Sequence, residues 1–217
     1  MQNARNIIGA PDSVPQGVVA LPKDYVHNVF ISYNYTELMK KWVNGPFKEL
    51  FEEYLGNALN DDARVGLFER EAIAGQHWPQ RLRDMLLRSR VLLAICSPGY
   101  FRSGWCLSEW ESFRLREEQL KRDGLRIPLL HNDGKHYMTQ HGVQWIQHVD
   151  FTKCAFFIGD PNKHPKGPEF EQKVYELADM VAEQVTKAPP FDPDWPLAEM
   201  PSVPTPNQPL QQLGQSH

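Results

Sequence analysis

Residues 88–113 read RSRVLLAICSPGYFRSGWCLSEWESF and place a strand directly before a helix. The stretch 90–97 is almost entirely apolar, which is typical of a central strand in a parallel sheet covered on both faces. From 103 to about Arg122 the apolar residues have helical spacing. A buried strand that passes through a Ser-Pro turn into a helix favours an α/β architecture.

The same alternation of strand and helix runs through most of the chain. Four more segments are predicted to hold strands, namely 26–32, 63–68, 125–130 and 149–158. Further helices are predicted at 36–59, 77–89, 140–147 and 167–187, the first bent by Asn-Gly-Pro at 44–46. Core positions expected in this first helix are Leu38, Trp42, Leu50, Tyr54 and Leu55. Right-handed crossovers between such strands predict a flavodoxin-like three-layer sandwich with a five-stranded parallel sheet.

Composition divides the chain into three parts. Residues 1–24 carry no periodicity and are interpreted as an N-terminal extension, and residues 25–187 form one domain. Residues 188–217 are proline-rich and are expected to form an extended tail. Trp195 and its neighbours are expected to pack on the domain, whereas the last dozen residues are expected to be disordered.

Charge and cysteine content exclude several classes of function. A net charge of −4 over 217 residues argues against nucleic acid or an anionic membrane as the main partner. No apolar segment is long enough to cross a bilayer, and the N-terminus lacks the pattern of a secretion signal. The three cysteines are an odd number and are interpreted as reduced thiols, so we expect a cytoplasmic protein.

Motifs for common ligands are absent at the ends of the strands. Neither GxxxxGK[ST] nor GxGxxG occurs, and no aspartate ends the third strand as in a phospho-accepting receiver. Ser97 has no GxSxG context, which favours a role in a turn. Four histidines are expected to be solvated loop residues rather than metal ligands, because their spacing fits no single helix face: His131, His136, His141 and His148.

Three segments together resemble a known family. VFISYNYTE (29–37), VGLFEREAIAGQHW (65–78) and the opening stretch (88–113) resemble, in order and spacing, the signature segments of Toll/interleukin-1 receptor (TIR) domains. The resemblance covers about residues 25–187 and is greatest to bacterial NAD-cleaving members. One departure is Glu69 in the loop that follows the second strand, where an aspartate is common.

The resemblance implies a set of site residues. Glu109, in the Trp-Cys-x-x-Glu segment, would be the catalytic carboxylate, with NAD as substrate and no cofactor or metal. Residues implied in substrate binding are Phe30, Ser32, Tyr33, Arg70 and Trp105. The loop after the second strand would mediate assembly with a second copy or a partner protein, through Glu71, Ala72, Ile73 and Gly75.

A helical wheel separates the two neighbouring acids of the opening stretch. Cys106, Leu107, Trp110 and Phe113 share one face, and Glu109 falls at its border, on the side of Trp105 one turn earlier. Glu111 falls toward solvent. The pattern alone favours an ordinary border acid that interacts with the helix dipole, and only the family resemblance favours a catalytic role for Glu109.

Three functions follow from the resemblance. The first is an NAD glycohydrolase or cyclase that acts when assembled and yields nicotinamide with free, cyclic or conjugated ADP-ribose, as in bacterial antiphage defence. The second is a non-catalytic TIR module that binds other TIR domains, as an adaptor or a host mimic does. The third is a sensor that binds NAD-like nucleotides without turnover.

Overall fold

The five strands of the sheet are all parallel and lie in the order β2-β1-β3-β4-β5. The computed structural model describes residues 24–68, 78–132, 137–155 and 163–202. The strands are β1 (His27–Tyr33), β2 (Val65–Leu67), β3 (Ser89–Cys96), β4 (Arg126–Leu130) and β5 (Val149–Asp150). The flavodoxin-like fold predicted from the sequence is therefore confirmed.

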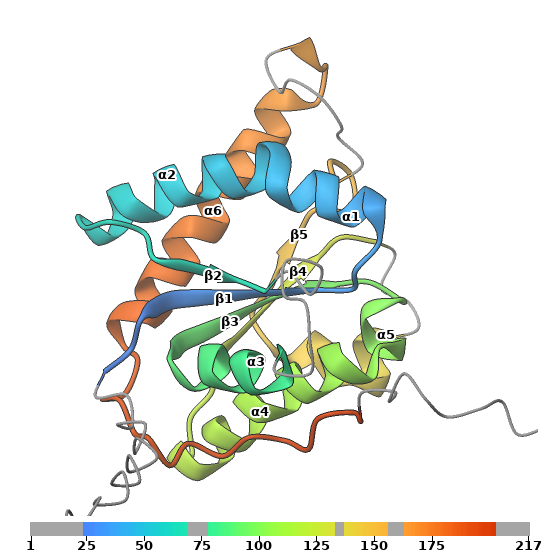
Figure 1. Cartoon of the computed structure of the whole chain (residues 1–217). Helices are drawn as coiled ribbons and strands as arrows, with labels where there is room; N and C mark the ends of the chain where they lie inside the picture. Colours follow the sequence, from blue (N-terminus) through green and yellow to red (C-terminus); the bar gives the residue numbers. More distant parts are fainter. Residues whose placement is uncertain (1–23, 69–77, 133–136, 156–162, 203–217) are drawn as a thin grey trace, which may run out of the picture.

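Helices cover both faces of this sheet (Figure 1). One face carries α1 (Glu37–Trp42), a π-helical turn (Val43–Phe47), α2 (Lys48–Leu59) and α6 (Gly167–Thr186). The other carries α3 (Trp78–Leu87), α4 (Gly104–Leu120) and α5 (Tyr137–Gln140), with 3-10 turns at Tyr100–Arg102 and Val143–Trp145. Within the described ranges, no helix combines the length and apolar character needed to span a membrane.

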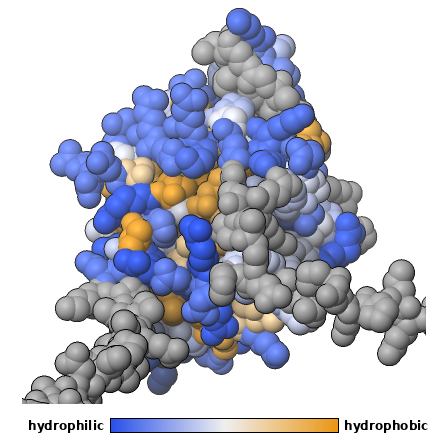
Figure 2. Space-filling view, in the orientation of Figure 1, coloured by the Kyte–Doolittle hydropathy of each residue, from blue (hydrophilic) through white to orange (hydrophobic). Residues whose placement is uncertain are grey.

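The core lies on both sides of β3. From Val91 to Cys96 the strand is completely buried, as expected for the centre of a doubly covered sheet. On the α1 side, the ring of Trp42 stacks on Phe47 with centroids 4.7 Å apart. Figure 2 shows mainly hydrophilic outward faces on α1 and α2, with hydrophobic residues gathered between α2 and the sheet.

The edge strands are shorter than predicted. β2 has three residues where 63–68 was expected, and β5 has two within 149–158. An edge strand pairs on one side only, so fewer hydrogen bonds extend it. The helix expected at 140–147 is α5 followed by a 3-10 turn, because Gly142 adopts a left-handed conformation (φ 66°) that ends α5. The bend at 44–46 is present, with Gly45 outside helical dihedral angles.

Two predictions about burial were wrong. Leu38 is 57% exposed, because Met39 and Trp42 occupy the inner face of α1. His131 was expected in a solvated loop, yet it is only 7% exposed. Its backbone N–H donates to Cys96 O, so it continues the ladder of β4, and its ring meets Trp42 edge-on at 4.8 Å.

Residues 188–202, called the C-terminal strap below, run along α4 (Figure 1). Trp195 is 6% exposed, and its Nε1 donates to the Tyr25 hydroxyl at 3.1 Å. Ala198 N donates to Ser112 Oγ at 3.0 Å, and Ser108 Oγ donates to Glu199 O at 2.9 Å. The expected packing of Trp195 is therefore seen, and the strap covers a face of α4.

Candidate functional site

Glu109 lies in the second turn of α4. The Ser103 side chain caps the helix by accepting a hydrogen bond from Cys106 N at 3.4 Å. The face that carries Cys106, Trp110 and Phe113 is buried, which turns Glu109 inward as well. Glu109 is 5% exposed, whereas the Glu111 side chain is 40% exposed and pairs with Arg114. The two acids thus differ as the helical wheel indicated.

The Glu109 carboxylate is tied to the sheet by hydrogen bonds. Ser32, next to the last residue of β1, donates its hydroxyl proton to Glu109 Oε2. Ser32 Oγ also lies 2.9 Å from the Tyr100 hydroxyl. A serine has one proton, so Tyr100 must donate to Ser32 when Ser32 donates to Glu109. These groups form a buried chain, called the Tyr100–Ser32–Glu109 relay below.

Tyr100 suits the donor role in this relay. It is completely buried, and burial raises the pKa of its hydroxyl well above the ordinary value, with nearby Cys106 and Glu109 adding to the rise. The hydroxyl therefore stays protonated at neutral pH. The Ser97 hydroxyl accepts from Tyr100 N at 3.1 Å, so Ser97 fixes the turn that positions this ring.

Glu109 faces a small hollow, called the Glu109 hollow below. Phe30, Ser32 and Tyr33 line it together with the carboxylate, as the resemblance implied. Its other walls are Ile31, Tyr35 and Phe68. A volume of ≈ 20 Å³ gives room for about one water molecule, so this conformation does not admit a dinucleotide.

Not every predicted site residue reaches this hollow. Trp105 lies beside Trp78, with ring centroids 4.3 Å apart, and Trp78 in turn lies 5.9 Å from Phe68. Trp105 is thus part of an aromatic row that ends at a wall of the Glu109 hollow. Arg70 and the assembly residues Glu71, Ala72, Ile73 and Gly75 lie outside the described residues.

Three residues of this region were predicted from the sequence to have a structural role but were not predicted as site residues. Trp78 and Phe68 were interpreted as parts of a helix and a strand, and Tyr100 as part of the Ser-Pro-x-Tyr turn. The position of Tyr100 in that turn, just after a strand end, is the signal that could have placed it near the site. A Cβ at Gly99 would lie 2.4 Å from Asn34 Nδ2, so a larger residue in this turn would displace the Asn34 side chain.

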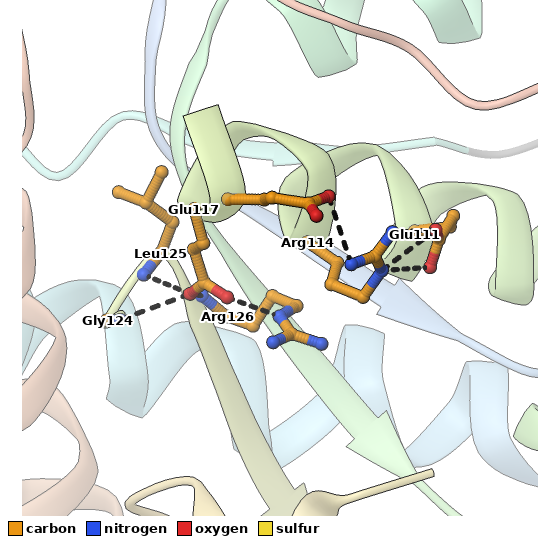
Figure 3. A network of polar contacts seen from close by, with 7 residues as sticks. Glu111, Arg114, Glu117, Gly124, Leu125 and Arg126 are labelled. Atoms are coloured by element: carbon orange, nitrogen blue, oxygen red, sulfur yellow. Dashed lines mark hydrogen bonds and ion pairs between the residues drawn. The ribbon is translucent and has the colours of Figure 1, made fainter. Parts of the chain in front are cut away.

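The far end of α4 is held by a second polar network (Figure 3). Glu117 is buried and accepts from the backbone N–H groups of Gly124, Leu125 and Arg126 at 2.8–3.1 Å. Arg126 Nε also donates to it, at 2.6 Å. Four donors on one carboxylate anchor the helix to the start of β4 and thereby help to fix the position of Glu109.

Of the four histidines considered as metal ligands, His131, His141 and His148 lie in the described part of the chain and His136 lies outside it. No group of three His, Cys, Asp or Glu side chains in the described part could hold an ion. His131 packs on Trp42, and the His141 ring stacks on Phe101 at 4.4 Å. Burial lowers the pKa of both histidines.

Comparison with known proteins identifies a family. A family model described as a TIR domain matches residues 29–157. A search of curated proteins found no match. Among solved structures, the chain is similar to an oxidoreductase from Corynebacterium diphtheriae, at 10% identity and a TM-score of 0.41, covering 77% of this chain and 100% of that one. A likeness this low carries no functional argument.

Proposed function

This chain belongs to the TIR domain family, and from that premise we propose that it cleaves the nicotinamide–ribose bond of NAD, with Glu109 as the catalytic carboxylate. The observation that supports this most is the burial of Glu109 together with its hydrogen bond from Ser32, at the carboxyl end of β1. The products would be nicotinamide and ADP-ribose, free, cyclised or conjugated. Bacterial antiphage defence is the setting we propose for such a signal.

The chemistry requires one well-placed carboxylate. Nicotinamide in NAD is a cationic leaving group and departs as a neutral molecule, so no general acid is needed. The ribose then carries oxocarbenium-like positive charge, which a nearby carboxylate stabilises. Ser32 holds Glu109 in one orientation, so little reorganisation is needed as that charge develops.

The aromatic row offers a place for the nicotinamide ring. Trp105, Trp78 and Phe68 lie next to one another beside the Glu109 hollow. A cationic ring is attracted to the face of an indole. Tyr33 would form the opposite wall, and Arg70 would meet a phosphate of the substrate.

Access to Glu109 must come from a change in conformation or from assembly. The Glu109 hollow holds about one water molecule, whereas a drug-sized ligand needs several hundred Å³. We propose that self-association, or binding of a partner protein, opens the hollow. Turnover should then rise steeply with protein concentration.

A non-catalytic docking module is the second candidate. The small size of the Glu109 hollow favours it, and so does Trp145, which is 83% exposed in the 3-10 turn before β5. Exposed tryptophans are enriched at the energetic centres of protein interfaces. In this function, Glu109 would serve only to join α4 to β1.

Nicotinamide release distinguishes the two candidates. Concentrated protein is incubated with NAD, and the products are separated by chromatography for the wild type, Glu109→Ala and Glu111→Ala. We expect loss of activity with the first variant and retention with the second. No turnover in any assembled state would favour the docking module, and equal loss in both variants would indicate damage to α4.

A further inference from the structure

A second and much larger cavity lies over the carboxyl edge of the sheet. Its volume is ≈ 1000 Å³, which is enough for a nucleotide. Its walls include Asn34 after β1, Ser97 after β3, Asn132 after β4 and Asp150 at the end of β5. Glu109 is not among its lining residues.

The position of this cavity follows from the strand order. The chain passes from β1 to β2 on one side and then crosses to β3 on the other, so the order reverses between β1 and β3. In open α/β sheets, ligands bind beyond the carboxyl ends of the strands at such a reversal. The cavity therefore lies where this architecture commonly accepts a small molecule.

One part of the cavity wall is apolar and partly exposed to solvent. Leu38, Met39 and Met138 line it, and Leu38 is 57% exposed although its spacing in α1 predicted burial. An apolar ring placed against Leu38 would remove this surface from water. This part of the cavity therefore suits a flat, largely apolar group such as a nucleobase.

The polar part of the wall carries one cation and one carboxylate. Arg102 is exposed, and no ion pair found among the described residues includes it. Its planar guanidinium matches a phosphate. Burial alone would raise the pKa of Asp150, but hydrogen bonds from Thr152 lower it below the ordinary value, so Asp150 is ionised at neutral pH and can accept from hydroxyl groups.

We propose that this cavity is a second ligand site that binds a nucleoside monophosphate, with its phosphate on Arg102, its base against Leu38 and its ribose hydroxyls near Asp150. The site is separate from the Glu109 hollow. Tyr33 and Tyr35 line that hollow, whereas Asn34 and Thr36 line the cavity. The two sites thus meet at the connection between β1 and α1, through which one ligand can influence the other site.

Titration calorimetry of the full chain with AMP tests the proposal. We expect Arg102→Ala to weaken AMP binding at least about tenfold, the loss of roughly one charge-assisted contact. Thr152→Trp, which places an indole inside the cavity, should weaken binding at least about tenfold, and adenosine without its phosphate should bind at least about tenfold more weakly than AMP. Arg81→Ala, at an exposed arginine on α3, is the matched control and should bind AMP as the wild type does.

The outcomes separate this site from the proposed active site. Glu109→Gln should bind AMP with an affinity within about twofold of that of the wild type. Loss of AMP binding in this variant would place AMP at Glu109 and overturn the proposal. Wild-type protein that binds no AMP at millimolar concentration would overturn it too. So would unchanged binding in folded Arg102→Ala and Thr152→Trp, checked by thermal unfolding. Nicotinamide release is independent of all these results, so either proposal can fail alone.

Discussion

Ser32 on β1 hydrogen-bonds the carboxylate of Glu109 on α4, joining residues 77 positions apart in the chain. Both side chains are buried. The contact holds the candidate catalytic group against the carboxyl edge of the sheet, where α/β proteins commonly bind their ligands.

Ser32→Ala should lower both stability and turnover. The change leaves buried polar groups of Glu109 and Tyr100 without this partner, at a cost of about 1–3 kcal/mol in the free energy of unfolding. Urea unfolding measures this cost, with Ser202→Ala, at an exposed serine, as the control. If Ser32→Ala unfolds at the wild-type urea concentration, the hydrogen bond does not stabilise the fold.

Tyr100→Phe should change how stability depends on pH. The pKa of Tyr100 is raised in the folded state, chiefly by burial, so above about pH 10 the unfolded chain loses a proton that the folded chain keeps. The wild type should therefore lose about 1.4 kcal/mol of stability per pH unit there through this group. In denaturant unfolding, the wild type should lose about 1.4 kcal/mol more stability than the variant between pH 9 and pH 11. Equal losses in the two proteins would contradict the buried, protonated hydroxyl.

Glu117→Ala and Glu111→Ala should differ widely in stability, although both remove a paired glutamate from α4 (Figure 3). Glu117 is buried with four donors, and its loss should cost about 3–5 kcal/mol. Glu111 forms a half-exposed pair with Arg114, worth at most about 1 kcal/mol. Equal melting temperatures for the two variants would show that the anchoring role of Glu117 is wrong.

Deleting residues 188–217 should destabilise the protein, whereas deleting 203–217 should not. The longer deletion uncovers the surface buried by Trp195 and removes the hydrogen bonds to Ser108 and Ser112, together about 3–5 kcal/mol. Thermal and urea unfolding of both truncated chains measure the difference. Equal stability of the two truncated chains would contradict a stabilising role for the C-terminal strap.

The sequence predicted the sheet well, because hydrophobic periodicity reports burial directly. Residues 90–97 were expected as the central strand, and β3 occupies 89–96. The edges were less predictable, since β2 and β5 each pair with a neighbour on one side only, which no local pattern reveals. Leu38 shows the same limit, because Met39 and Trp42 occupy the inner face of α1.

The candidate site was predicted in part. Phe30, Ser32, Tyr33 and Glu109 do surround one hollow, as the family resemblance implied. The role of Tyr100 in the relay depends on a contact between residues 68 positions apart, which spacing alone does not encode.

The burial of Arg116, which lies outside the candidate site, was also not predicted from the sequence. Arg116 is 1% exposed, and its guanidinium donates to the carbonyls of Leu86 and Ser89. The sequence does not indicate which backbone carbonyls will accept hydrogen bonds from a buried side chain.

The central claim is that the Glu109 carboxylate performs the cleavage, and the initial rate of nicotinamide release by Glu109→Gln tests it most directly. Glutamine keeps the shape of the side chain and can still accept from Ser32, but it lacks the negative charge. At a protein concentration where the wild type and Glu111→Gln turn over NAD, we predict a rate at least about 100-fold lower for Glu109→Gln, with an unchanged melting temperature. Turnover by Glu109→Gln at the wild-type rate would contradict the account.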